Sequence, residues 1–287
     1  MRDSSLSKNK PAYRISLFLL FLTFSLLVFF INLTFTDVIL LKTGIILKIV
    51  LMAVFLISAF LLYRSQSLNI YWKVFFTFFI ASIAIFLALY LGKWGLRVLN
   101  LENNTLNGVT LNKFLEDLVI ILSIIILSRV TGRDLASIYL KRGKLKLGLI
   151  IGVTSFLLLY LTSALQAAGQ NISFGKFFSL TPWILIIILA DGFMEELLFR
   201  GLFLKKFESF LGAKLSIILT ALIYSLAHLQ VTYTSELLFF LAILFILGVI
   251  WGYIIQKTDG LWGSVLFHAG ADSLIIMQAL ISFGVTS

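Results

Sequence analysis

The feature that most restricts the fold of this chain is a series of long apolar runs, separated by short polar or basic segments. Nine runs follow one another, over residues 15–35, 44–63, 74–92, 114–128, 147–165, 181–204, 214–231, 237–256 and 261–283. Most of them reach the ~20 apolar residues that an α-helix needs to cross a bilayer. A helix also satisfies its backbone hydrogen bonds internally, as the bilayer demands. The pattern therefore predicts an all-α, polytopic helical bundle with about eight or nine transmembrane helices.

The composition agrees with a membrane environment. Apolar residues make up 60% of the 287 residues and charged residues only 13%, whereas a soluble domain has about 25% charged residues. The run at 114–128 is the weakest, because it is short and has Glu116 and Asp117 near its start. A tilted or interfacial helix is the alternative there. We predict an integral, multi-pass membrane protein with the lipid bilayer as its surroundings.

The net charge of +10 does not predict nucleic-acid binding, because Lys and Arg lie in short segments between apolar runs. That distribution is typical of charges that orient membrane helices. With the N-terminus inside, the inner segments hold 16 Lys and Arg residues and the outer segments hold 5. The bias predicts a cytoplasmic N-terminus and no nucleic-acid partner.

The chain has no cysteine, which excludes disulfides, thiolate metal sites and a cysteine nucleophile. Together with the abundance of Ile, Leu, Lys and Phe, this suits a bacterial plasma membrane.

Polar stretches at 93–113 and 129–146 suggest how the chain is organised. We expect an outer loop at 93–113 and a basic cytoplasmic linker at 129–146, which anionic lipid would attract to the membrane surface. Residues 1–113 would form an N-terminal part with about three spans and the outer loop. Residues 114–287 would form a C-terminal core. The linker at 129–146 is also a candidate boundary between an N-terminal helical bundle and a C-terminal core.

Ionisable groups inside the spans gather late in the chain. The run at 181–204 contains Asp191, Glu195, Glu196 and Arg200, the next run contains His228, and the last contains His268 and Asp272. These are the only two histidines, and the first three runs contain only Lys48 by comparison. Charged groups inside a bilayer are costly, so such a collection points to a function.

Helical spacing sorts these groups by face. Glu196 and Arg200 are four residues apart and can pair, as can His268 and Asp272. Glu195 points about 100° away from Glu196 and is free to face another neighbour. At about 1.5 Å per residue, Glu195 and the two histidines lie roughly 12–21 Å from the cytoplasmic ends of their runs. We therefore expect them to converge at similar depth.

This set of residues fits a hydrolase that activates water. A carboxylate in an apolar pocket is a stronger base towards a bound water, and an imidazole can hold that water or stabilise an oxyanion. No serine or cysteine nucleophile is then required. Glu and His are also zinc ligands, but the sequence has no HExxH motif. We expect no required cofactor, with a divalent metal such as zinc as the alternative.

Structural readings compete with this one. Glu196 and Arg200 can be an ordinary buried ion pair, and a single intramembrane histidine more often makes a helix–helix hydrogen bond. Asp191 and Tyr224 can be packing contacts. Structure alone does not easily explain why both histidines, two adjacent glutamates and an aspartate gather in three late runs.

Three motifs in this part of the chain resemble those of a known family. They are Glu195-Glu196-Leu-Leu-Phe-Arg200 followed by Gly201, Tyr224-Ser-Leu-Ala-His228, and His268-Ala-Gly-Ala-Asp272. Their order and spacing, over roughly residues 115–285, resemble those of the CAAX-protease and bacteriocin-processing (CPBP, Abi) family of intramembrane glutamate-dependent proteases. The resemblance makes residues 114–287 the protease core.

The resemblance also implies roles for the site residues. Glu195 would be the general base that activates water, and His228 would help to hold that water. His268 and the residue at 272 would stabilise the oxyanion, while Glu196 and Arg200 would support the site. Family members with Asn at the last position can donate a hydrogen bond to the oxyanion, and an ionised Asp272 cannot. Asp272 would therefore be protonated, orient His268 or help to bind a cation.

The expected function is that of an intramembrane endopeptidase which hydrolyses a peptide bond in a membrane-associated protein or peptide. The alternative is a non-catalytic bacteriocin-immunity or membrane scaffold protein of the same fold. A third interpretation is a carrier that uses buried carboxylates as a proton relay. Such a carrier would have inverted repeats and helices broken by Gly or Pro, whereas this chain has only two prolines and no detected internal repeat.

Overall fold

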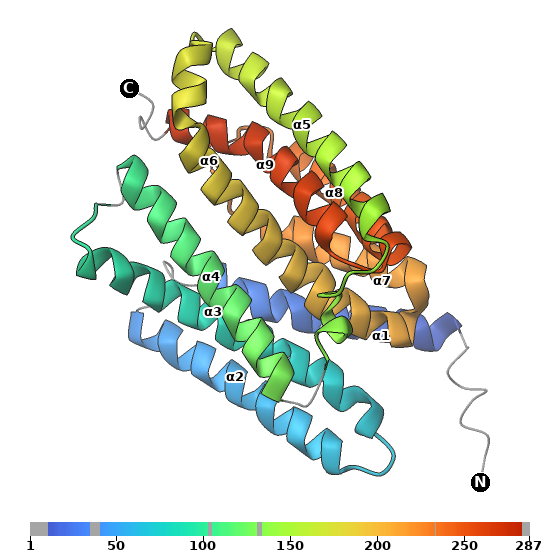
Figure 1. The fold of residues 1–287 in the computed structure, drawn as a ribbon. Coiled ribbons are helices and arrows are strands. Elements are labelled where there is room, and N and C mark those ends of the chain that lie inside the picture. Colours follow the sequence, from blue (N-terminus) through green and yellow to red (C-terminus); the bar gives the residue numbers. More distant parts are fainter. Residues whose placement is uncertain (1–10, 35–40, 103–104, 131–133, 233, 283–287) are drawn as a thin grey trace. The chain divides into compact units, whose positions relative to one another are not determined.

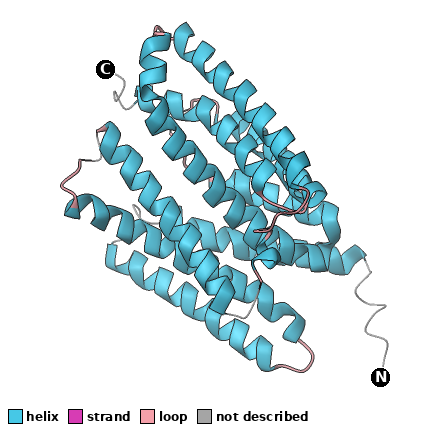
Figure 2. Ribbon diagram, in the orientation of Figure 1, coloured by secondary structure: helices cyan, strands magenta, loops and turns pink. Residues whose placement is uncertain are grey.

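The computed structural model describes residues 11–34, 41–102, 105–130, 134–232 and 234–282. Within these ranges the chain is helical apart from turns and loops, and it contains no strand (Figure 2). The expected all-α fold is confirmed for this part of the chain.

Each of the nine apolar runs corresponds to one α-helix of the described residues. The helices are α1 (Pro11–Phe29), α2 (Leu41–Arg64), α3 (Trp72–Val98), α4 (Leu106–Val130), α5 (Leu145–Gly169), α6 (Phe174–Glu195), α7 (Lys205–Ala227), α8 (Leu237–Thr258) and α9 (Trp262–Ser282). Four short elements lie between them, namely the 3₁₀ helices η2 (Asn69–Tyr71) and η3 (Leu135–Ile138) and the π-helices η1 (Phe30–Thr34) and η4 (Glu196–Leu204).

Six stretches of the described residues are long and apolar enough to cross a membrane, judged by length and composition. One of them, Phe174–Ala227, has 54 residues and joins α6, η4 and α7, more than twice the ~20 residues that one crossing needs. Helix α4 is not among the six, because Lys113, Glu116 and Asp117 interrupt its apolar sequence. The chain is an integral, multi-pass membrane protein, and the cytoplasmic N-terminus stays a prediction.

Large apolar side chains on the outer surfaces of the helices agree with a lipid environment. On α5, Leu158 and Leu165 are 63% and 65% exposed, and on α2 Ile46 and Leu61 are both 61% exposed. Soluble monomers rarely expose apolar surface in extended patches. Lipid contact makes such exposure favourable.

The chain folds as two compact units, which are described separately. Unit 1 comprises residues 1–86 and 199–253, and unit 2 comprises residues 87–198 and 254–287. The units alternate along the sequence because α3, η4 and α8 each pass from one to the other. This is a division by packing, and the boundary that the sequence suggests at residue 113 stays a prediction.

In unit 2, α5, α6 and α9 lie side by side, and α6 also contacts α4 (Figure 1). Glycines let α5 and α9 approach closely. A Cβ at Gly263 would lie 2.6 Å from the carbonyl oxygen of Gly148, and one at Gly270 would lie 2.8 Å from the Cα of Phe156. Small residues allow this kind of contact between helices in a membrane, where apolar surface alone does not drive association.

In unit 1, α1 packs against η4 and α7 through aromatic rings. Phe21 stacks on Phe207 with ring centroids 5.0 Å apart, and Phe29 stacks on Phe199 at 4.9 Å. Helix α7 is kinked at Gly212, whose φ of 76° lies in the left-handed region that glycine tolerates. The kink separates a short first segment from the apolar run expected from residue 214 onward.

Candidate active site

The two adjacent glutamates lie where one kind of helix changes into another. Glu195 is the last residue of α6, and Glu196 begins the π-helix η4. The sequence predicted one α-helical stretch through residue 204, with Glu196 and Arg200 paired at a spacing of four. The wider turns of a π-helix change that spacing, so the period behind the expected pairing does not hold beyond Glu195.

His268 of α9 lies between the two glutamates. Its Nδ1 is 2.8 Å from Oε1 of Glu196, and its Nε2 is 3.2 Å from Oε2 of Glu195. The two carboxylates, which the helical period directed to different neighbours, therefore meet opposite nitrogens of one imidazole. The structure brings the first and third motifs together.

The two glutamates differ in their access to solvent. The side chains of His268 and Glu196 are fully buried, while that of Glu195 is 14% exposed. Glu196 is held from both sides, because Ser264 of α9 donates a 2.6 Å hydrogen bond to its Oε2. Glu196 is thus held at both carboxylate oxygens, and Glu195 is the more exposed of the two glutamates.

Ser264 is a contact that the sequence analysis missed. It precedes His268 by four residues, just as His268 precedes Asp272, so all three lie on one stripe of α9. A search for polar residues along that stripe would have found it.

Asp272 lies at the other end of this stripe. Its Oδ1 is 3.5 Å from Nε2 of His268, and its Oδ2 is buried with no hydrogen-bond partner. A protonated Oδ2 would be a hydrogen-bond donor, which the ionised form lacks.

Close packing of α6 against α9 holds the two sides of this group together. A Cβ at Gly192 would lie 3.0 Å from the backbone nitrogen of Ala269 and 3.2 Å from the carbonyl oxygen of Val265. Gly192 precedes Glu195 by three residues, and Ala269 follows His268 directly. The contact therefore sets the spacing between glutamates and imidazole.

A second charged group joins α4 to α6. Nζ of Lys113 lies 2.9 Å from Oδ1 of Asp117, on its own helix, and 2.6 Å from Oδ1 of Asp191, on α6. From the sequence, Asp191 is one of the clustered ionisable groups, with a packing contact as the alternative, and Lys113 falls at the end of the expected outer loop. The sequence already contained a signal, since Lys113 and Asp117 are four residues apart at the start of an apolar run.

The remaining expected site residues belong to unit 1. The guanidinium of Arg200 is fully buried and lies over the ring of Tyr224, 4.6 Å from its centroid, and 5.4 Å from that of Trp251. These are cation–π distances. His228 follows the last residue of α7, and its Nδ1 lies 2.9 Å from the backbone oxygen of Tyr224. Within unit 1, the second motif is therefore held by the contacts of Tyr224 with Arg200 and with His228.

Metal coordination was the alternative chemistry for these residues. Among the described residues, no group of three or more His, Cys, Asp or Glu side chains has an arrangement that could hold a metal ion. In unit 2, both nitrogens of His268 face carboxylate oxygens of the chain.

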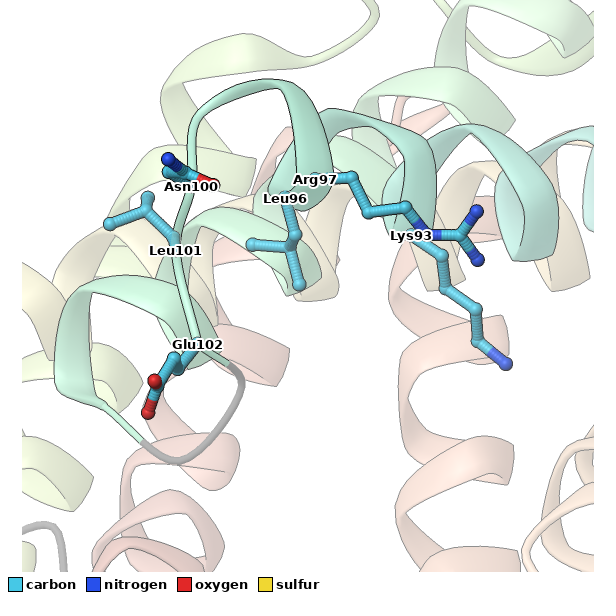
Figure 3. Close-up of a pocket in the computed structure, with 6 residues that line it drawn as sticks. All are labelled: Lys93, Leu96, Arg97, Asn100, Leu101 and Glu102. Carbon is cyan, nitrogen blue, oxygen red and sulfur yellow. The ribbon is translucent and has the colours of Figure 1, made fainter.

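A pocket of about 610 Å³ lies elsewhere in unit 2, at the end of α3. Its lining consists of Lys93, Leu96, Arg97, Asn100, Leu101 and Glu102. Figure 3 shows the side chains of Lys93 and Arg97 extending to the same side, with Glu102 apart from them. None of the expected site residues belongs to this lining.

Comparison with known proteins gives one match. Residues 176–274 match the family model described as type II CAAX prenyl endopeptidase Rce1-like. The matched segment is about a third of the chain and contains all three motifs. No curated protein and no solved structure matches the chain.

Proposed function

We propose, on the premise that residues 176–274 belong to the Rce1-like family of CAAX-type intramembrane proteases, that this chain hydrolyses a peptide bond by means of a glutamate-activated water. The observation that supports the proposal best is the placement of His268 between a buried Glu196 and a partly exposed Glu195. A general base must be open to its water, and Glu195 is the more exposed of the two glutamates.

In the proposed reaction, Glu195 removes a proton from water while the water oxygen attacks the carbonyl carbon of the peptide bond. The carbonyl oxygen becomes an oxyanion, which His268 and a protonated Asp272 would stabilise as donors. Glu195 then returns the proton to the leaving nitrogen, and the C–N bond breaks. Glu196 holds the imidazole in place, in the way a carboxylate orients the histidine of a catalytic triad.

The second motif has a supporting part in this proposal. His228 would help to hold the attacking water, and Arg200, packed on Tyr224 and Trp251, would support the site. The substrate would be a membrane-associated peptide or protein, because the motifs lie on apolar helices of a membrane protein.

Cleavage by purified variants tests the proposal. Peptide products are measured by mass spectrometry, with a prenylated CAAX peptide and a panel of unmodified apolar peptides as substrates. We expect Glu195→Ala and His228→Ala to lose activity, by ~10²- to 10⁴-fold where general-base catalysis is removed. Glu236→Ala, at an exposed position of unit 1, is the matched control. Unchanged cleavage in both site variants would refute the assignment.

A cellular assay separates catalysis from binding. If Glu195→Ala abolishes cleavage and yet cells keep full protection against a bacteriocin, the physiological role is that of the non-catalytic immunity protein. If Glu195→Ala abolishes both cleavage and protection, the result supports the proposed peptidase function.

We propose that the reaction needs no metal, because the imidazole of His268 is already engaged on both sides by carboxylates. Dialysis against a chelator should leave cleavage unchanged. Activity that is lost on chelation and restored by Zn²⁺ would establish the zinc alternative.

A further inference from the structure

The charged group on α4 lies on the same face of α6 as the proposed base. Lys113 contacts Asp191, and Asp191 and Glu195 are four residues apart on α6, on one stripe of the helix. The ion pair of Lys113 with Asp191 therefore lies one helical turn from the proposed base on α6, and the imidazole of His268 contacts the base from α9.

The carboxylates around this site outnumber the cations. Around Glu195, Lys113 of α4 bridges Asp117 and Asp191, the latter one turn before Glu195 on α6, and His268 of α9 contacts Glu195, Glu196 and Asp272. Oδ2 of Asp117 is buried and has no hydrogen-bond partner, so that carboxyl is satisfied on one side only. Like charges at close range disfavour ionisation, and a nearby opposite charge favours it.

We propose that Lys113 is a positioning residue which, by holding Asp191 and offsetting its charge, keeps Glu195 ionised and able to act as a base. The inference rests on the proposed function for its catalytic meaning, but the charge relation itself can be measured without any substrate. Without the ammonium group, the carboxylate of Asp191 would lie one helical turn from Glu195 with nothing to offset it. Glu195 would then hold its proton up to a higher pH.

The proposal makes two predictions of opposite sign. Lys113→Met removes a positive charge, so Glu195 should protonate at a higher pH, by about one pH unit. Asp191→Asn removes a negative charge, so Glu195 should protonate at a lower pH than in the unmodified protein. Lys113→Arg keeps the charge and should behave as the unmodified protein does. Damage to the fold would not move the midpoint in opposite directions.

Infrared spectroscopy measures the midpoint directly. The full chain in lipid nanodiscs is titrated, and the carboxyl C=O band of Glu195 is identified by its loss in Glu195→Gln. Lys176→Met, at an exposed position near the start of α6, is the control and should leave the midpoint in place. If Lys113→Met does not fold, two variants still test the proposal. Asp191→Asn should move the protonation midpoint of Glu195 to lower pH, and Lys113→Arg should leave it unchanged.

A cleavage assay with the prenylated CAAX peptide gives the second readout. The acidic limb of the kcat profile should move with the infrared midpoint, and KM should stay the same because the proposed effect of Lys113 is on the base. The double variant Lys113→Met/Asp191→Asn should recover most of the kcat lost in Lys113→Met.

The two readouts separate the two claims. A midpoint that stays in place in both Lys113→Met and Asp191→Asn overturns this inference, even if cleavage depends on Glu195. A midpoint that moves as expected, in a protein that cleaves none of the peptides, supports the charge relation and refutes the proposed function.

Discussion

At the scale of single residues, the two glutamates of the candidate site differ in their contacts. Glu196 is fully buried between Ser264 and His268, whereas Glu195 shares the outer nitrogen of the imidazole with Asp272. Two neighbouring glutamates thus have different tasks in the proposed reaction. The difference comes from their surroundings, since their side chains are chemically the same.

Substitutions at Asp272 test whether a protonated carboxyl group donates a hydrogen bond to the oxyanion at this position. Asp272→Asn should lose much less activity than Asp272→Ala, because an amide donates a hydrogen bond as a protonated carboxyl does. For Asp272→Ala we expect kcat to fall by ~10²-fold or more, the usual effect of removing one oxyanion donor. Equal losses in the two variants would instead favour a charged Asp272 that orients His268.

Substitutions at Ser264 test whether its hydrogen bond to Glu196 stabilises the candidate site. Ser264→Ala leaves one oxygen of a buried carboxylate without its 2.6 Å hydrogen bond, which should lower the free energy of unfolding by about 1–3 kcal/mol. We expect kcat to fall as well, because His268 loses an anchored partner, while KM changes little. Thermal unfolding in detergent and steady-state kinetics measure the two effects. Ser264→Thr, which keeps the hydroxyl, should retain more of both.

At the scale of elements, the site is built where helices approach closely. Helix α6 meets α9 at Gly192, and α5 meets α9 at Gly263. Helix α6 also ends at Glu195 and continues as a π-helix, a type of element that is frequent at functional sites. These features fix the position of α9, and with it His268, relative to the glutamates.

Gly263→Ala tests the contact between α5 and α9. The new methyl group would lie 2.6 Å from a backbone oxygen of Gly148, so one helix must move. We expect a loss of about 1–3 kcal/mol in unfolding free energy, with lower activity because α9 also carries His268. Gly175→Ala is the matched control, since its methyl group would meet only the Ser173 Oγ, at 3.9 Å. Equal stability in the two variants would contradict the close contact.

At the scale of the whole molecule, the apolar stretches fix the environment, while the orientation follows only from the distribution of basic residues. Six stretches of the described residues can cross a membrane, and one of them is long enough to cross twice. The 16-to-5 bias of Lys and Arg favours a cytoplasmic N-terminus. With every predicted run crossing, the one at 114–128 included, the segment between α5 and α6 faces outward and the segment before α5 faces inward.

Cysteine labelling tests the orientation, and the chain is well suited to it because it has no cysteine of its own. Lys176→Cys and Lys144→Cys both lie at exposed positions. A membrane-impermeant maleimide should label Lys176→Cys on intact cells and Lys144→Cys only after permeabilisation. The reverse pattern would contradict this topology, and a further cysteine before α1 would then show whether the N-terminus is outside or α4 does not cross.

The sequence by itself determined the class of fold and singled out most residues of the candidate site. Apolar runs of about 20 residues specify membrane helices because the bilayer leaves few other structures for the backbone. Ionisable residues within those runs are conspicuous because each is costly in lipid. Glu195, Glu196, His268 and Asp272 could therefore be selected without a structure.

Only the tertiary structure decided how these residues are partnered. The contact of both glutamates with one imidazole depends on where α9 packs against α6, which a helical period does not predict. The salt bridge from Lys113 to Asp191 joins residues 78 positions apart, on helices that meet only in the folded protein. Spacing along a sequence specifies the face of one helix, whereas the partner across an interface is set by the packing of two.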